Sequence, residues 1–60
     1  MAITIYFRGR YWRFRECDTE NMSEAEVISA ADKTGKIQHE ANGHTWLVVK
    51  GVGYGWEVEV

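Results

Sequence analysis

The chain has 60 residues, a formal net charge of −2 and a single cysteine. This length fits one domain, which buries only about 60% of the surface that its unfolded chain exposes. The lone cysteine excludes an internal disulfide, and no segment reaches the ~20 consecutive apolar residues that a membrane-spanning helix needs.

The stability of so small a core should therefore depend on aromatic side chains. The sequence supplies three Trp, three Tyr and two Phe, and a fully enclosed aromatic side chain buries roughly 150–250 Å². No signal-peptide pattern follows the first methionine, and a lone thiol suits a reducing compartment. We therefore expect a small cytoplasmic protein formed by residues 1–60 as a single domain.

The most informative segment is residues 6–15, YFRGRYWRFR, which interleaves four arginines and five aromatics around one glycine. Alternation along a strand, with a two-residue loop at Arg8-Gly9 or Gly9-Arg10, groups the bulky apolar residues on one face: Ile3, Ile5, Phe7, Trp12 and Phe14. A three-residue loop would scatter them over both faces, so burial favours the two-residue loop. Gly9 supplies the positive φ that such a loop requires. The other face then carries Thr4, Tyr6, Arg8, Tyr11, Arg13 and Arg15.

A helix is predicted after the polar loop of residues 17–21. Ser23 is the expected N-cap, and Glu26, three residues later, completes a capping box. The helix should cover residues 25–33 and end at Gly35. Its apolar face consists of Val27, Ile28 and Ala31. A helix this short is not stable alone, so we expect it to pack on the sheet.

A second hairpin is predicted from residues 36–41 and 44–50, which flank Asn42-Gly43. A two-residue turn there would pair His39 with Trp46. The glycine-rich residues 51–55 then lead into a last strand, residues 56–60. The whole pattern is ββαβββ, an α+β domain with an antiparallel sheet and one helix packed on one face.

The loop between the last two strands leaves an alternative. A two-residue turn at Gly51-Val52 would bury one set of side chains together: Leu47, Val49, Tyr54, Trp56 and Val58. Trp46 and Val48 would then lie on the open face, the face of the sheet away from the helix. A loop of odd length would instead group Trp46 and Val48 with Trp56 and Val58. We expect the two-residue turn, because it keeps few polar residues on the buried side.

The open face is the candidate binding surface, and its expected members combine aromatic rings with guanidinium groups: Tyr6, Arg8, Tyr11, Arg13, Arg15 and Trp46. Tyr, Trp and Arg are enriched at the centres of protein interfaces. Aromatic platforms with cations on a sheet also suit single-stranded DNA or RNA. The plain structural alternative is that Tyr and Arg are good solvent-facing strand residues that stack on one another.

The other reactive residues form no known catalytic or metal-binding pattern. His39 and His44 lack a zinc spacing, and Cys17 lies between Glu16 and Asp18, which oppose thiolate formation. The glycine-rich segment matches no phosphate-binding loop. We therefore expect no enzymatic activity, no cofactor and no metal.

These observations predict a small non-enzymatic binding protein, an adaptor, regulator or inhibitor of the kind that bacteria and their phages carry. It would dock on a protein partner through the open face or by adding a strand at an edge. The second hypothesis is a single-stranded DNA- or RNA-binding module that uses the same hairpin. A homodimer is a third hypothesis, and no membrane association is expected.

Overall fold

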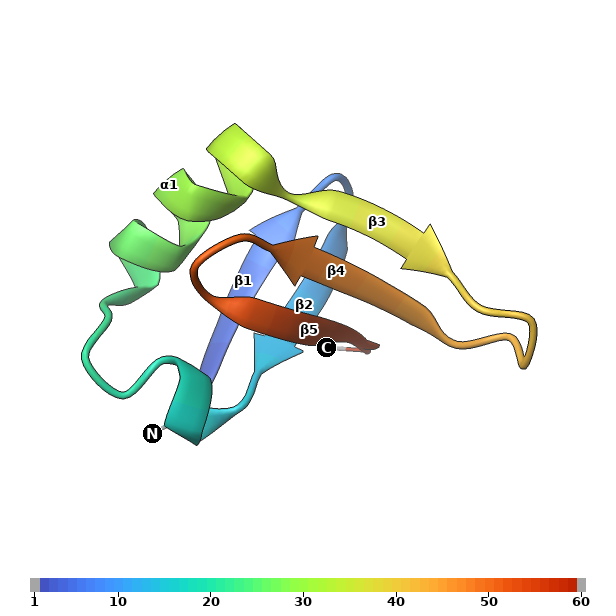
Figure 1. Cartoon of the computed structure of the whole chain (residues 1–60), viewed down its shortest axis with the longest axis horizontal. Coiled ribbons are helices and arrows are strands. Elements are labelled where there is room, and N and C mark those ends of the chain that lie inside the picture. The colour runs from blue at the N-terminus through green and yellow to red at the C-terminus, as the bar shows by residue number, and fades with distance from the viewer. Residues whose placement is uncertain (1, 60) are drawn as a thin grey trace.

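In the computed structural model, which describes residues 2–59, one antiparallel sheet carries one α-helix across one face (Figure 1). The strands are β1 (Ile3–Phe7), β2 (Arg10–Phe14), β3 (Lys36–His39), β4 (Thr45–Val49) and β5 (Gly53–Val58). Helix α1 covers Glu24–Thr34, and a short 3₁₀ helix, η1, covers Glu16–Asp18. The five strands lie in the order β1-β2-β5-β4-β3, so the last strand is the central one. The predicted α+β fold and element order are confirmed.

The first hairpin has the predicted two-residue loop. Phe7 pairs with Arg10, and the loop residues Arg8 and Gly9 have φ values of 53° and 81°. Positive φ at both positions is the property of a type I′ turn, whose twist matches that of the flanking strands. Trp12 and Phe14 are fully buried, as the alternation predicts.

Helix α1 begins with the predicted capping box. The Ser23 hydroxyl accepts a hydrogen bond from the Glu26 backbone N–H, and the Glu26 carboxylate accepts one from the Ser23 N–H. The helix ends at Gly35, whose φ of −63° is extended and not left-handed. Glycine is needed there for space, because a Cβ would lie 2.5 Å from the Ala31 carbonyl oxygen.

The predicted register of the second hairpin is wrong by one residue. His39 pairs with Thr45, and Trp46 pairs with Gln38. The loop has three residues, 41–43, closed by hydrogen bonds from Glu40 N–H to His44 O (2.9 Å) and from Gly43 N–H to Glu40 O (3.0 Å). Gly43 has a φ of 89°, as expected for a three-residue loop that ends in a left-handed residue. An Asn-Gly pair therefore fits this loop as well as the two-residue turn.

The predicted turn between β4 and β5 is also wrong. Val49 pairs with Gly53, so the loop has an odd length, and Tyr54 and Trp56 share the open face with Trp46. Leu47 and Val49 are buried, as expected. The physical reason lies in β5, whose core-facing residue Gly55 lies under the ring of Phe14; a Cβ there would be 2.7 Å from that ring.

The core lies between α1 and the covered face of the sheet. It contains nine buried apolar side chains: Ile5, Phe7, Trp12, Phe14, Val27, Ala31, Leu47, Val49 and Val52. The helix packs mainly on β1 and β4 (Figure 1). The opposite face of the sheet has no covering element among residues 2–59 (Figure 1).

Candidate functional site

The open face is the side of the sheet away from α1, and the strand registers fix which side chains it carries. Its members are Thr4, Tyr6, Tyr11, Arg13, Arg15, Lys36, Gln38, Glu40, Trp46, Val48, Tyr54, Trp56 and Val58. One row of paired residues crosses the sheet from β2 to β3: Arg13, Trp56, Trp46 and Gln38. Directly opposed side chains of this kind have Cβ atoms about 4.5–5.5 Å apart.

Five aromatic side chains lie on this face, and three of them are strongly exposed. Tyr6, Tyr11 and Tyr54 expose 59%, 40% and 59% of their surfaces. The rings of Tyr6 and Tyr11 contact each other edge to face, with centroids 5.0 Å apart. Trp46 and Trp56 are half-buried. Several exposed aromatic side chains on one uncovered face are typical of an interaction site.

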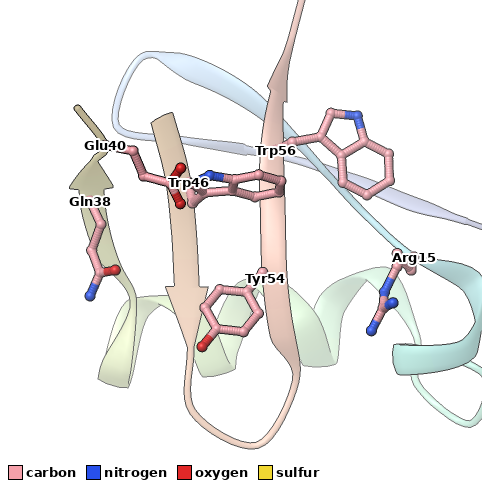
Figure 2. Close-up of a pocket in the computed structure, with 6 residues that line it drawn as sticks. All are labelled: Arg15, Gln38, Glu40, Trp46, Tyr54 and Trp56. Atoms are coloured by element: carbon pink, nitrogen blue, oxygen red, sulfur yellow. The ribbon is translucent and has the colours of Figure 1, made fainter. Parts of the chain in front are cut away.

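A hollow of about 420 Å³ lies on the open face over β3, β4 and β5 (Figure 2). Its lining residues come from these three strands and from the positions just after β2 and β3: Arg15, Gln38, Glu40, Trp46, Tyr54 and Trp56. Figure 2 shows the ring of Tyr54 next to that of Trp46, with Gln38 and Glu40 on one side and Arg15 on the other. The hollow therefore has aromatic walls between an acidic end and a basic end.

The indole nitrogen of Trp46 is buried and has no hydrogen-bond partner among residues 2–59. It lies on the same side of the hollow as the Glu40 carboxylate (Figure 2). A buried donor without a partner costs about 1–3 kcal/mol, so this N–H lowers the stability that Trp46 contributes to the fold. The core indole of Trp12 differs, because it donates to the Phe7 carbonyl oxygen at 2.9 Å.

The two arginines of this face are in different electrostatic states. Arg15 donates to both carboxylate oxygens of Asp18, at 3.0 and 3.2 Å. These hydrogen bonds and the charge of Asp18 raise the pKa of Arg15 above its ordinary value. Arg13 is exposed, and within residues 2–59 it forms no ion pair. Arg13 is therefore the guanidinium that is free to bind a carboxylate or a phosphate.

One predicted site residue lies elsewhere. Arg8 occupies the β1–β2 turn, and its guanidinium carbon is 5.3 Å from the ring centroid of Phe7, a core residue. It is therefore separated from the hollow. Of the other predicted members, Arg15 and Trp46 line the hollow, whereas Tyr6, Tyr11 and Arg13 lie on the open face outside its lining. The remaining lining residues had not been assigned to the site by sequence reasoning: Gln38, Glu40, Tyr54 and Trp56.

A signal for Tyr54 and Trp56 was present in the sequence. Glycines occupy positions 51, 53 and 55, and the aromatic residues alternate with them at 54 and 56. In a strand, this alternation puts the rings on the face opposite to the glycines. If the glycines face a large core side chain such as Phe14, both aromatic residues belong to the open face.

The remaining reactive side chains stay dispersed. Among residues 2–59 no group of three or more His, Cys, Asp or Glu side chains could hold a metal ion. His39 Nδ1 is 3.1 Å from the Thr45 hydroxyl, and Cys17 is exposed in η1. None of the helices in this part of the chain has the length and apolar character needed to cross a membrane.

Searches of family models, curated proteins and solved structures found no match to this chain. A fold of this kind does not by itself indicate an activity. The open face, with its exposed rings, its hollow and the guanidinium of Arg13, is therefore the candidate site from which a function can be proposed.

Proposed function

We propose that this protein is a non-enzymatic binding module that docks on a protein partner through the open face of its sheet. The observation that carries the proposal is the uncovered aromatic row beside Arg13. Trp, Tyr and Arg are the residues that most often dominate binding energy at protein interfaces, where they fill or form pockets near the centre. Here two tryptophans and a tyrosine line a hollow, and Arg13 pairs directly with Trp56 across β2 and β5.

The chemistry of the hollow supports binding more than catalysis. Its ionisable members are the Glu40 carboxylate, the Tyr54 hydroxyl and the Arg15 guanidinium, which is already bonded to Asp18. A catalytic site needs a nucleophile or a base within hydrogen-bond reach of a group that it activates. A hollow whose walls are mostly aromatic offers contact area instead.

Strand β3 is an edge strand beside the hollow, so a partner could also bind along it. β3 is short, mostly exposed and paired on only one side, and its Gln38 lines the hollow. An extended segment of a partner could add to such an edge by main-chain hydrogen bonds. A partner that lies across the hollow would then contact β3 as well.

The test is capture of partners from a lysate of the cells that express the protein, with Tyr11→Ala and Arg13→Ala compared with the parent chain. Each replacement should weaken capture by about tenfold or more, the effect of roughly 1.4 kcal/mol. Arg10→Ala is the matched control, because Arg10 lies on the same strand but pairs with Glu57 away from the open face. Undiminished capture by a folded Tyr11→Ala, Arg13→Ala double variant would contradict the proposal.

The exposed Tyr6–Tyr11 pair favours a second candidate function, binding of single-stranded nucleic acid. Bases stack on such rings, and Arg13 could contact a phosphate. The net charge of −2 weighs against it, since phosphate neutralisation supplies most of that affinity. Titration with a labelled oligonucleotide decides the matter, because true nucleic-acid binding must weaken steeply as salt is raised.

A further inference from the structure

We infer that the hollow accepts one apolar side chain from an acidic segment of the partner, and that an acidic residue of this segment binds Arg13. The inference rests on the docking function proposed above and specifies the chemistry of the docked segment. The size and walls of the hollow, the charge of the open face and the position of Arg13 each support it.

The hollow fits a side chain. Its volume of about 420 Å³ is near the small end of the roughly 300–1,000 Å³ found for ligand pockets. Three of its six lining residues are Trp46, Tyr54 and Trp56, which offer ring faces and edges to an apolar group. Buried aromatic or aliphatic anchors in such pockets provide much of the binding energy at interfaces.

The charge of the open face selects an acidic segment. Arg13, Arg15 and Lys36 give three positive charges, while Glu40 and Asp18, the carboxylate bonded to Arg15, give two negative charges, so the face carries +1. The whole chain carries −2, so the remainder carries −3. The acidic residues Glu24, Glu26 and Asp32 lie on α1, across the sheet from this face. A partner segment of negative charge therefore complements the open face and is repelled by the helix side.

The position of Arg13 specifies where the acidic residue must be. Arg13 lies directly across from Trp56, a wall of the hollow, which places their Cβ atoms about 4.5–5.5 Å apart. In an extended segment, residues two positions apart share a face and are separated by roughly 6.6 Å. An Asp or Glu within two positions of the anchor thus reaches Arg13, whose guanidinium can bind a carboxylate through two hydrogen bonds.

A nucleic-acid strand fits this geometry less well. The Glu40 carboxylate closes one end of the hollow, and the guanidinium at the other end is already bonded to Asp18. A phosphate chain over the hollow would meet one free guanidinium and one carboxylate. The same carboxylate does not oppose an apolar anchor.

The three indole N–H groups provide the readout in ¹H–¹⁵N spectra of the labelled protein. The probe is a capped peptide with Phe at its centre and Glu two positions away on each side. The Trp46 and Trp56 indole signals should shift on titration to about 1 mM peptide. The Trp12 signal should stay in place, because that N–H is bonded to Phe7 inside the core.

Two altered peptides and two altered proteins test the specificity of binding. Replacing the central Phe by Ala, or both Glu residues by Lys, should each lower the affinity at least tenfold. Arg13→Glu should reverse the preference, so that the Lys-containing peptide binds better than the Glu-containing one. Arg10→Glu makes the same change in net charge on the opposite face of β2, and a folded Arg10→Glu protein should keep the original preference.

Other outcomes overturn the inference in distinguishable ways. Equal binding of the Glu and Lys peptides, or binding of an oligo-dT probe at peptide-like affinity, would exclude an acidic segment as the specific occupant. If no peptide shifts the indole signals while Arg13→Ala still abolishes partner capture, the inference fails and the docking function stands. If Arg13→Ala leaves capture intact as well, both fail.

Discussion

Trp12 and Trp46 lie on opposite faces of one sheet, and the two side chains differ in burial and in hydrogen bonding. Trp12 is fully buried beneath α1, and its indole N–H is bonded to the Phe7 carbonyl oxygen. Trp46 is half-buried on the open face, and its indole N–H has no partner in the described part of the chain. The covered face satisfies its polar atoms internally, whereas the open face leaves a donor beside an aromatic hollow.

In this very small chain, the covered face of the sheet therefore supplies the stability of the fold, and the open face supplies the candidate binding surface. Each strand residue faces either the helix or the open side, so the same twelve-residue hairpin, residues 3–14, supplies both core side chains and part of the candidate binding surface. Because α1 covers only one face, aromatic residues on the other face add little burial. The docking function proposed above would give these exposed rings a role that the stability of the fold does not require.

The largest expected contrast is between Trp12→Ala and Trp46→Ala. Removing the buried indole should cost about 3–5 kcal/mol, which approaches the whole stability of a domain for which roughly 0.05–0.15 kcal/mol per residue is typical. Trp46→Ala should cost less than about 1 kcal/mol, because it also removes an unsatisfied donor worth about 1–3 kcal/mol. Urea denaturation followed by circular dichroism measures both values. Similar losses would show that the open face is part of the core.

The next contrast concerns Gly55, which keeps β5 close to Phe14. A Cβ at position 55 would lie 2.7 Å from the Phe14 ring, so Gly55→Ala should destabilise the protein by about 1–3 kcal/mol through overpacking. In a Phe14→Leu background the same replacement should cost less, since the smaller side chain leaves room. A thermal-unfolding double-mutant cycle measures this coupling, and strict additivity would contradict the proposed contact.

A smaller effect is expected when the helix that covers the core face is weakened at its first turn. Ser23→Ala removes the cap from the Glu26 N–H and should cost about 0.5–2 kcal/mol. Ser29→Ala is the control, because Ser29 is exposed within α1 and alanine favours helix formation. Partner binding by the folded Ser23→Ala protein should be unchanged, since the helix lies on the other side of the sheet. Weakened binding at full folding would contradict the division between the faces.

The sequence alone was sufficient to predict the first hairpin and the helix, because in each segment one arrangement was clearly more favourable than the alternatives. Only an even loop at Arg8-Gly9 or Gly9-Arg10 places Trp12 and Phe14 beside the apolar residues of β1, and the capping box at Ser23 has few alternatives. Local chemistry and burial therefore gave the same answer in both segments. Tyr11 and Arg13 could be assigned to the open face for this reason alone.

The registers of the strands in the second half of the sheet could not be predicted in this way. β3 contains one large apolar residue, Ile37, so alternation there does not distinguish registers that differ by one. The side on which Trp56 lies depends on the contact between Gly55 and Phe14, residues 41 positions apart in the chain. Such a tertiary contact is known only from the folded structure. Without it, the aromatic residues of β5 have the sequence pattern of core residues.

The smallest expected effect is the coupling between the rings of Tyr6 and Tyr11, and it tests the plain structural explanation of the open face. Their edge-to-face contact has a centroid distance of 5.0 Å, and exposed cross-strand pairs of this kind contribute about 0.2–1 kcal/mol. A double-mutant cycle with Tyr6→Leu and Tyr11→Leu, measured by urea denaturation, gives the coupling directly. A value in this range is too small to account for five aromatic side chains on an uncovered face. A coupling well above it, together with partner capture unaffected by Tyr11→Leu, would mean that these rings serve the stability of the hairpin and that no docking function is needed to explain them.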